Sequence, residues 1–156
     1  MGSDEALEAA ARAAAGASRP SGDGALAGVG VDLVDLERFA AILARTPRLA
    51  ERVFAPEERG LPVRSLAARF AAREAAIKAI GGLDGLDLVD LEVVRGADGA
   101  PAFARGPRLD AALRARGIGE LRLSLSHDGA SAIAFVVAER APRGADADAG
   151  RGLAGA

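Results

Sequence analysis

The order of apolar and polar residues changes period along the chain, from alternation to helical spacing and back again. Residues 28–34 alternate, which predicts a strand with Val29, Val31 and Leu33 on one face and Asp32, beside Val34, on the other. Asp35 is a suitable N-cap, and apolar residues then recur at helical spacing as far as Arg45. The folded part of the chain is therefore expected to begin with a strand that leads directly into a helix.

The longest predicted helix covers 65–80 and ends at Gly81 and Gly82. Shorter elements complete the pattern: helical segments at 48–54 and 107–116, a helix start at Pro56, and strands at 88–94, 101–104, 121–125 and 130–138. Asp128-Gly129 is typical of a turn between the last two strands. This order, without internal repeats, predicts one α+β domain whose helices pack on a mainly antiparallel sheet.

Composition limits the domain to 28–140. The segments 1–27 and 141–156 are rich in small residues and are expected to be flexible. The chain of 156 residues has no cysteine, which excludes disulfide scaffolds, thiolate metal sites and cysteine nucleophiles. A net charge of −2 argues against bulk nucleic-acid binding, and neither a membrane-spanning run nor a secretory signal pattern is seen. We therefore expect a cytoplasmic protein without nucleic-acid or membrane partners.

Two carboxylates stand among apolar residues. Asp32 interrupts an apolar strand, so it is either a strand-end residue that faces water or a charge that needs a cation. Glu74 shares a helix face with apolar residues, and Lys78, the single lysine, follows one turn later. The Glu74–Lys78 pair fits either an ordinary surface ion pair or a functional site.

The single histidine, His127, lies where a strand meets the turn at Asp128-Gly129. It fits a turn residue with a satisfied hydrogen bond as well as a ligand-binding residue. Ser126 beside it is no evidence for a hydrolase triad, because adjacent strand residues point to opposite faces. Two carboxylates with Lys, His and many Arg side chains favour magnesium-assisted chemistry on a phosphate or pyrophosphate. The sequence has neither a P-loop nor a dinucleotide-binding glycine motif.

Arginines recur every seven residues at positions 38, 45 and 52, close to two helical turns. Pro47 interrupts the segment, so Arg38 and Arg45 are the firmer pair. They form either a solvated basic face or a docking strip for an acidic partner.

Three segments carry a family resemblance: GVGVDLVDLERF (28–39), ARFAAREAAIKAIG (68–81) and LSLSHDGASAIAFVV (123–137). In order and spacing they resemble the holo-[acyl-carrier-protein] synthases, the short 4′-phosphopantetheinyl transferases. FAPEE (54–58) and GAP (99–101) resemble weaker motifs of that family. The resemblance implies transfer of phosphopantetheine from coenzyme A to a serine of an apo acyl carrier protein, with release of adenosine 3′,5′-bisphosphate.

The resemblance also implies residue roles. Asp32 and Glu74 fall on magnesium-ligand positions. Lys78 and His127 fall on positions near the coenzyme A phosphates, with Arg69 and Ser126 as further cofactor-binding candidates and Glu74, Lys78 and His127 as catalytic ones. Arg38 falls on a carrier-binding position, to which Arg45 is added. The serine proton would pass to Glu74 or to a water on the metal. The family further implies a homotrimer and a role in fatty acid biosynthesis.

Two departures from the family pattern stand out. Arg73 replaces the lysine that usually precedes the glutamate, and Ala100 replaces a common basic residue. Two alternatives stay open at this point: a noncatalytic coenzyme A-binding or carrier-docking module, and a transferase domain from a larger synthase.

Overall fold

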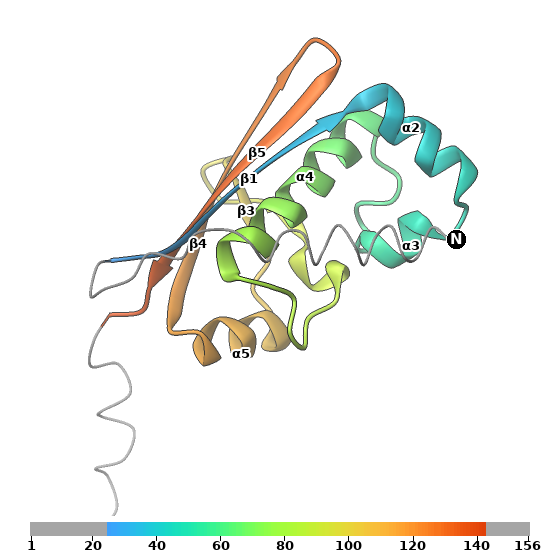
Figure 1. Cartoon of the computed structure of the whole chain (residues 1–156). Coiled ribbons are helices and arrows are strands. Elements are labelled where there is room, and N and C mark those ends of the chain that lie inside the picture. The colour runs from blue at the N-terminus through green and yellow to red at the C-terminus, as the bar shows by residue number, and fades with distance from the viewer. Residues whose placement is uncertain (1–24, 143–156) are drawn as a thin grey trace, which may run out of the picture.

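A three-stranded antiparallel sheet and one long helix form the framework of residues 25–142, which are those described by the computed structural model. The strands β1 (Leu26–Asp35), β5 (Ser131–Arg140) and β4 (Ile118–Asp128) lie side by side in that order. The helix α4 (Val63–Ile80) runs along one face of the sheet (Figure 1). The α+β fold with a mainly antiparallel sheet is confirmed.

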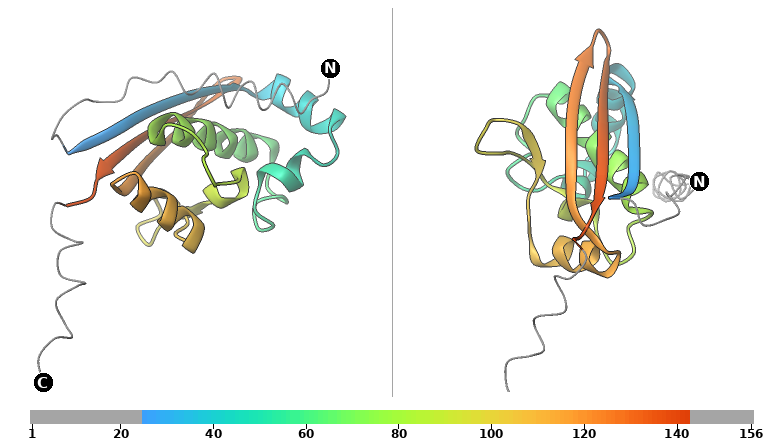
Figure 2. Two further views of the ribbon diagram at one scale, coloured as in Figure 1. Left: turned by 60° about the horizontal axis from the view of Figure 1, so that its bottom comes forward. Right: turned by 90° about the vertical axis from the view of Figure 1, so that its left-hand side faces the viewer.

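Short elements surround α4. They are α2 (Leu36–Arg45), α3 (Leu49–Val53), the 3₁₀ turn η2 (Leu88–Leu91), the two-stranded sheet of β2 (Val93–Arg95) and β3 (Pro101–Phe103), and α5 (Pro107–Ala115). Figure 2 shows α3, η2 and α5 on the side of α4 that faces away from the main sheet. The helix α4 is therefore enclosed by the sheet on one side and by short elements on the other. Its alanines, Ala67, Ala68, Ala71, Ala72, Ala75, Ala76 and Ala79, are all buried.

The backbones of β1 and α4 approach each other closely. A Cβ atom on Gly30 would lie 2.9 Å from the Ala79 nitrogen and closer still to the Ala75 carbonyl oxygen. A Cβ atom on Gly28 would meet the Ala79 carbonyl in the same way. Glycine is required at both positions because no side chain fits between strand and helix. The next residue of β1 that faces α4 is Asp32. The contact at Gly28 and Gly30 therefore determines which turn of α4 lies opposite Asp32.

Three large apolar side chains of β1, those of Val29, Val31 and Leu33, face away from α4, whereas Val34 is buried in the core. Leu33 is 63% exposed, and it lies across from Ile133, just as Val31 lies across from Phe135. All four, together with Val29, count among the exposed large apolar residues. Among the described residues, no helix covers this outer face of the sheet (Figure 2). The alternation in the sequence thus correctly predicts two faces, but the glycine and aspartate face is the one that packs on the helix.

Local signals set most boundaries. The Asp35 side chain accepts a hydrogen bond from the Arg38 backbone nitrogen at 2.8 Å, which confirms it as the N-cap of α2. Gly81 adopts a φ of 85° at the C-cap of α4, and Gly129 one of 53° in the β4–β5 turn. These positive φ values explain why glycine ends the helix and turns the hairpin.

Two sequence predictions are wrong. Residues 88–94 were expected to form one strand, but Leu88–Leu91 is a 3₁₀ turn and only Val93 and Val94 of that range belong to β2. The cause is a capping box between Asp87 and Asp90, in which each side chain bonds to the other's backbone. Residues 56–60 form turns instead of starting a helix at Pro56. The segments predicted to be flexible lie outside the described residues except for 25–27 and 141–142.

Gly30→Ala tests the close contact of β1 with α4. The added methyl group meets the Ala75 carbonyl, so we expect the free energy of unfolding to fall by about 2–3 kcal/mol. Gly60→Ala is the matched control because nothing lies within 4 Å of its Cβ position, and it should change stability by less than about 0.5 kcal/mol. Urea unfolding of both variants gives the comparison. Equal stability of the two variants would show that β1 and α4 have room between them.

Candidate functional site

Lys78 ties α4 to β1. Its Nζ donates to Asp32 Oδ1 at 2.8 Å and to the Val31 carbonyl oxygen at 3.0 Å. The side chains of Asp32 and Lys78 are only 18% and 28% exposed. Lys78 therefore forms a partly buried ion pair with a residue 46 positions away in sequence, and not the surface pair within one helix that the sequence left open. Asp32 is likewise not a strand-end residue that faces water.

Glu74 lies one helical turn before Lys78 and is buried, with 8% exposure. Burial raises the pKa of the Glu74 carboxyl, the nearby Asp32 charge raises it further, and Lys78 opposes both effects. Among the described residues, neither a hydrogen bond nor an ion pair reaches this carboxylate. The site thus holds two carboxylates and one ammonium, and the buried carboxylate is left without a direct partner.

A cavity of about 180 Å³ opens beside the two carboxylates. Asp32 and Glu74 line it, as does Arg38 from α2. Phe39 and Phe70 form part of its apolar wall, with ring centroids 5.4 Å apart. The cavity therefore joins a polar centre, an apolar wall and a basic side chain at the junction of β1, α2 and α4.

Arg69 and His127 lie in a second cavity of about 220 Å³. Ser65 and Arg95 also line it, so its polar groups are mainly cationic or neutral donors. His127 Nε2 lies 3.3 Å from the Arg64 carbonyl oxygen, to which it donates when it carries the proton. Arg69 precedes Glu74 by five residues, about 7 Å along the helix axis. Within one protomer, His127 therefore lines a different cavity from Asp32, the residue that Lys78 binds.

The remaining predicted site residues lie apart from both cavities. Ser126 is exposed and pairs with Ile133, which places it on the outer face of the sheet. Arg45 is exposed, and its Nε donates to the Ala41 carbonyl oxygen at 3.2 Å. The structure brings Asp32, Glu74, Lys78 and Arg38 together, and it separately brings together Arg69 and His127.

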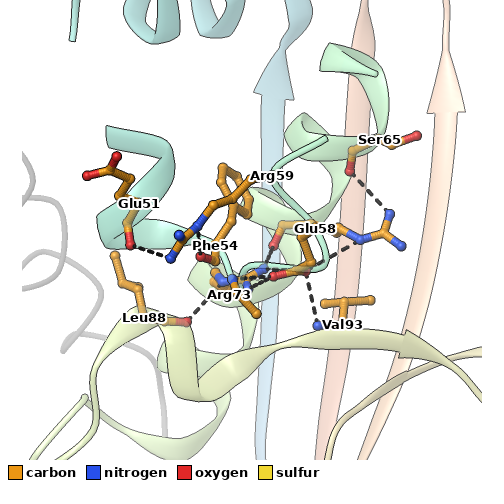
Figure 3. A network of polar contacts seen from close by, with 10 residues as sticks. Glu51, Phe54, Glu58, Arg59, Ser65, Arg73, Leu88 and Val93 are labelled. Carbon is orange, nitrogen blue, oxygen red and sulfur yellow. Dashed lines mark hydrogen bonds and ion pairs between the residues drawn. The ribbon is translucent and has the colours of Figure 1, made fainter. Parts of the chain in front are cut away.

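A buried ionic network around Glu58 was not predicted (Figure 3). The Glu58 carboxylate accepts hydrogen bonds from Nη1 and Nη2 of Arg73. Arg73 Nε donates to the Leu88 carbonyl oxygen at 2.9 Å. The Arg73 guanidinium also lies 5.0 Å from the centre of the Phe54 ring. Arg73 is fully buried and its guanidinium bonds to Glu58 and to backbone carbonyls, so its replacement of the family's lysine concerns this buried network. The FAPEE segment was the one sequence signal that included Glu58.

The carboxylate pair fits Mg²⁺. Among the described residues, no three aspartate, glutamate or histidine side chains gather into a complete cation site. Mg²⁺, however, is commonly held by one or two carboxylates and completes its coordination with water and substrate phosphates. No donor from residues 25–142 reaches the buried Glu74 carboxylate, so Asp32 and Glu74 can both serve as oxygen ligands.

Comparisons with known proteins agree on one family. A model described as the 4′-phosphopantetheinyl transferase superfamily matches residues 28–135. A curated holo-[acyl-carrier-protein] synthase of Clavibacter sepedonicus is 55% identical over 112 residues, covering 72% of this chain and 94% of the relative.

Solved structures give the same result. The holo-[acyl-carrier-protein] synthase of Neisseria meningitidis is 38% identical, with a TM-score of 0.67, and covers 72% of this chain and 98% of its own. A coenzyme A complex from Chronobacterium ammoniagenes is 34% identical, with a TM-score of 0.63, and covers 74% and 98%.

Glu74→Gln tests the burial of an unpaired carboxylate. The raised pKa means that the folded state binds the proton more tightly than the unfolded chain. Without metal, the free energy of unfolding should therefore fall as pH rises from the ordinary glutamate pKa of 4.5 to the raised value. Glu74→Gln should flatten that slope and stabilise the protein at pH 7. Denaturant unfolding in EDTA measures both, with the exposed Glu37→Gln as control; identical pH profiles for wild type and Glu74→Gln would contradict the burial effect.

Proposed function

The chain belongs to the 4′-phosphopantetheinyl transferase superfamily, and we propose that Asp32, Glu74 and Lys78 form the centre at which it carries out its reaction. The enzyme transfers 4′-phosphopantetheine from coenzyme A to a serine of an apo acyl carrier protein and releases adenosine 3′,5′-bisphosphate. One observation carries the proposal. Beside a cavity, β1 and α4 bring together a buried carboxylate, a second carboxylate and the chain's single lysine.

Asp32 and Glu74 would hold Mg²⁺. When bound, the ion supplies positive charge next to the pyrophosphate of coenzyme A. Lys78 already lies against Asp32, so its ammonium is in position to donate to a phosphate oxygen bound at the same place. The serine hydroxyl attacks the β-phosphate, and the bond between this phosphorus and the bridging oxygen breaks. Adenosine 3′,5′-bisphosphate leaves with that oxygen.

The attacking serine must lose its proton. Glu74 lines the cavity beside Asp32, so its carboxylate is the proton acceptor that this chain itself offers there. We assign the acceptor role to Glu74 on this ground. The noncatalytic alternative loses its motivation, because the three side chains that catalysis needs are present and adjacent.

The second cavity would take another phosphate of coenzyme A. Arg69 and His127 line it, and Ser65 offers a hydroxyl. Related synthases from Chronobacterium ammoniagenes and Helicobacter pylori were solved as complexes with coenzyme A. Coenzyme A carries a 3′-phosphate in addition to its pyrophosphate. His127 would therefore act on a different phosphate from Lys78, and the role proposed for Ser126 requires a ligand at the outer face of the sheet.

The basic residues of α2 would receive the carrier protein. Arg38 lies at the cavity that holds the carboxylates, and Arg45 is exposed two turns further along the helix. The chain itself has a net charge of −2, so attraction to an acidic carrier requires a local basic strip.

The outer face of the sheet would pack against further copies of the chain. This agrees with the homotrimer that the family resemblance implies. Five large apolar side chains are exposed there: Val29, Val31, Leu33, Ile133 and Phe135. Sedimentation velocity tests this assembly, and a monomer at high concentration would contradict it. Among the described residues, no helix is long and apolar enough to cross a bilayer. The cytoplasmic location and the link to fatty acid biosynthesis stay predictions.

Asp32→Asn tests the catalytic centre. The variant keeps the size of the side chain but removes the charge that would hold Mg²⁺ and pair with Lys78, so transfer should fall by at least about 100-fold. Purified protein is incubated with coenzyme A, Mg²⁺ and an apo carrier protein, and mass spectrometry follows the phosphopantetheine mass gain. Asp98→Asn, at an exposed aspartate in the β2–β3 turn, serves as control. Near wild-type turnover of Asp32→Asn with unchanged Mg²⁺ dependence would refute the proposed centre.

Arg38→Glu tests the docking strip. Reversing this charge should raise the KM for the carrier protein about tenfold and leave the KM for coenzyme A within about twofold. Salt should also weaken wild-type docking, because charges at an exposed surface are screened. Steady-state kinetics at several ionic strengths provide both measurements, with Arg114→Glu on α5 as control. Equal effects on both substrates would count against docking at α2.

A further inference from the structure

Glu58 is a buried carboxylate shared by two arginines. It is 2% exposed and accepts backbone hydrogen bonds from Ala55 at 2.9 Å and Val93 at 3.2 Å. Arg73 binds both of its oxygens (Figure 3), and Arg69 Nε lies 3.4 Å from its Oε1. One negative charge therefore faces two positive charges, and the surplus charge is positive.

The two arginines use this carboxylate differently. Arg73 is fully buried, and backbone carbonyls and Glu58 occupy its nitrogens. Arg69 has a buried Nε that lies against the Glu58 carboxylate, with a geometry short of a full hydrogen bond. Its Nη1 lies 3.5 Å from the Ser65 carbonyl oxygen, at the limit of a hydrogen bond, and no acceptor within the described part of the chain reaches its Nη2. Arg69 is thus held near Glu58 through Nε, and its Nη2 has no acceptor among the described residues.

Arg69 lines the cavity that His127 and Arg95 also line. We propose that Glu58 is a positioning residue for coenzyme A binding, which fixes Arg69 through Nε so that its Nη groups meet a phosphate in that cavity. This rests on the proposed function, which places a coenzyme A phosphate there. Arg73 then has a separate role, which is to neutralise the buried charge of Glu58, while the Ala55 and Val93 backbone amides fix the position of the carboxylate.

Glu58→Gln tests the proposal by kinetics. It removes the charge that holds Arg69, so the KM for coenzyme A should rise about tenfold, while the KM for the carrier protein stays within about twofold. Arg69→Gln should have the same effect, and the double variant should be no worse than either single variant, because Glu58 acts through Arg69. Arg73→Lys is the matched control. Lysine keeps a positive charge beside Glu58 but loses the hydrogen bonds of the guanidinium, and the Ala55 and Val93 amides still hold the carboxylate, so the variant should lower the melting temperature without raising the KM for coenzyme A.

A second measurement does not depend on activity. In wild-type protein without coenzyme A, the ¹⁵N-attached Hε proton of Arg69 should exchange slowly with water because Nε is buried against Glu58. Glu58→Gln should speed this exchange at least tenfold. Where Glu58→Gln does not fold, Glu58→Asp serves for both measurements, since it keeps the charge but draws it back by one methylene group.

The outcomes separate the two claims. Unchanged Arg69 exchange in Glu58→Gln, additive effects in the double variant, or an equal rise in the coenzyme A KM for Arg73→Lys would overturn the positioning role. Faster exchange together with an unchanged coenzyme A KM in both Glu58→Gln and Arg69→Gln would instead overturn the proposed cofactor cavity, leaving the contact between Glu58 and Arg69 established.

Discussion

The close approach of β1 to α4 is the constraint on which the rest of the structure depends. Gly28 and Gly30 let the strand backbone lie against the backbone of an alanine-rich helix. Asp32 is the next inward residue after Gly30, so this contact brings its carboxylate to Lys78 and beside Glu74. The same contact leaves the side chains of Val29, Val31 and Leu33 on the outer face. Small residues thus determine both where the charged cluster forms and which surface is available for association.

Charged side chains are buried at two places along α4, and the cost of burying them is offset differently at each. Around Glu58, the carboxylate is paired with Arg73 and accepts from two backbone amides, which makes the network a rigid support. Around Glu74, no donor from the described part of the chain reaches the carboxylate, and burial raises its pKa. An unsatisfied carboxylate is unfavourable for stability but suitable for binding a cation. The helix α4 therefore carries Arg73, which stabilises the fold through Glu58, next to Glu74, whose carboxylate is available to bind a cation.

Local signals explain how much of this could be predicted from sequence. Asp35 as N-cap, Gly81 as C-cap and the alternation in β1 act within a few residues, so the ends of α2 and α4 and the strand itself were predictable. The 3₁₀ turn at Leu88–Leu91 was missed because the Asp87–Asp90 capping box overrides an apolar run that suits a strand. The burial of Glu58 was also missed, because its partners Arg73 and Val93 lie 15 and 35 positions away. Asp32, Glu74 and Lys78 were identified as candidates, but their mutual contacts arise only from the packing of β1 on α4.

β1 is a single strand thick, and it carries the charged cluster on one side and bare apolar side chains on the other. Asp32 stands between Val31 and Leu33 in sequence. The charged side chain on the inner face and the apolar side chains on the outer face therefore belong to consecutive residues. Lys78 binds the Val31 carbonyl itself, which links the ammonium to the strand backbone. In the proposed assembly, a neighbouring copy that packs on Val31 and Leu33 would therefore also restrain the stretch of backbone that carries Asp32 and accepts from Lys78. Association would then tighten the charged cluster from the far side of the strand, so a loss of association would loosen it.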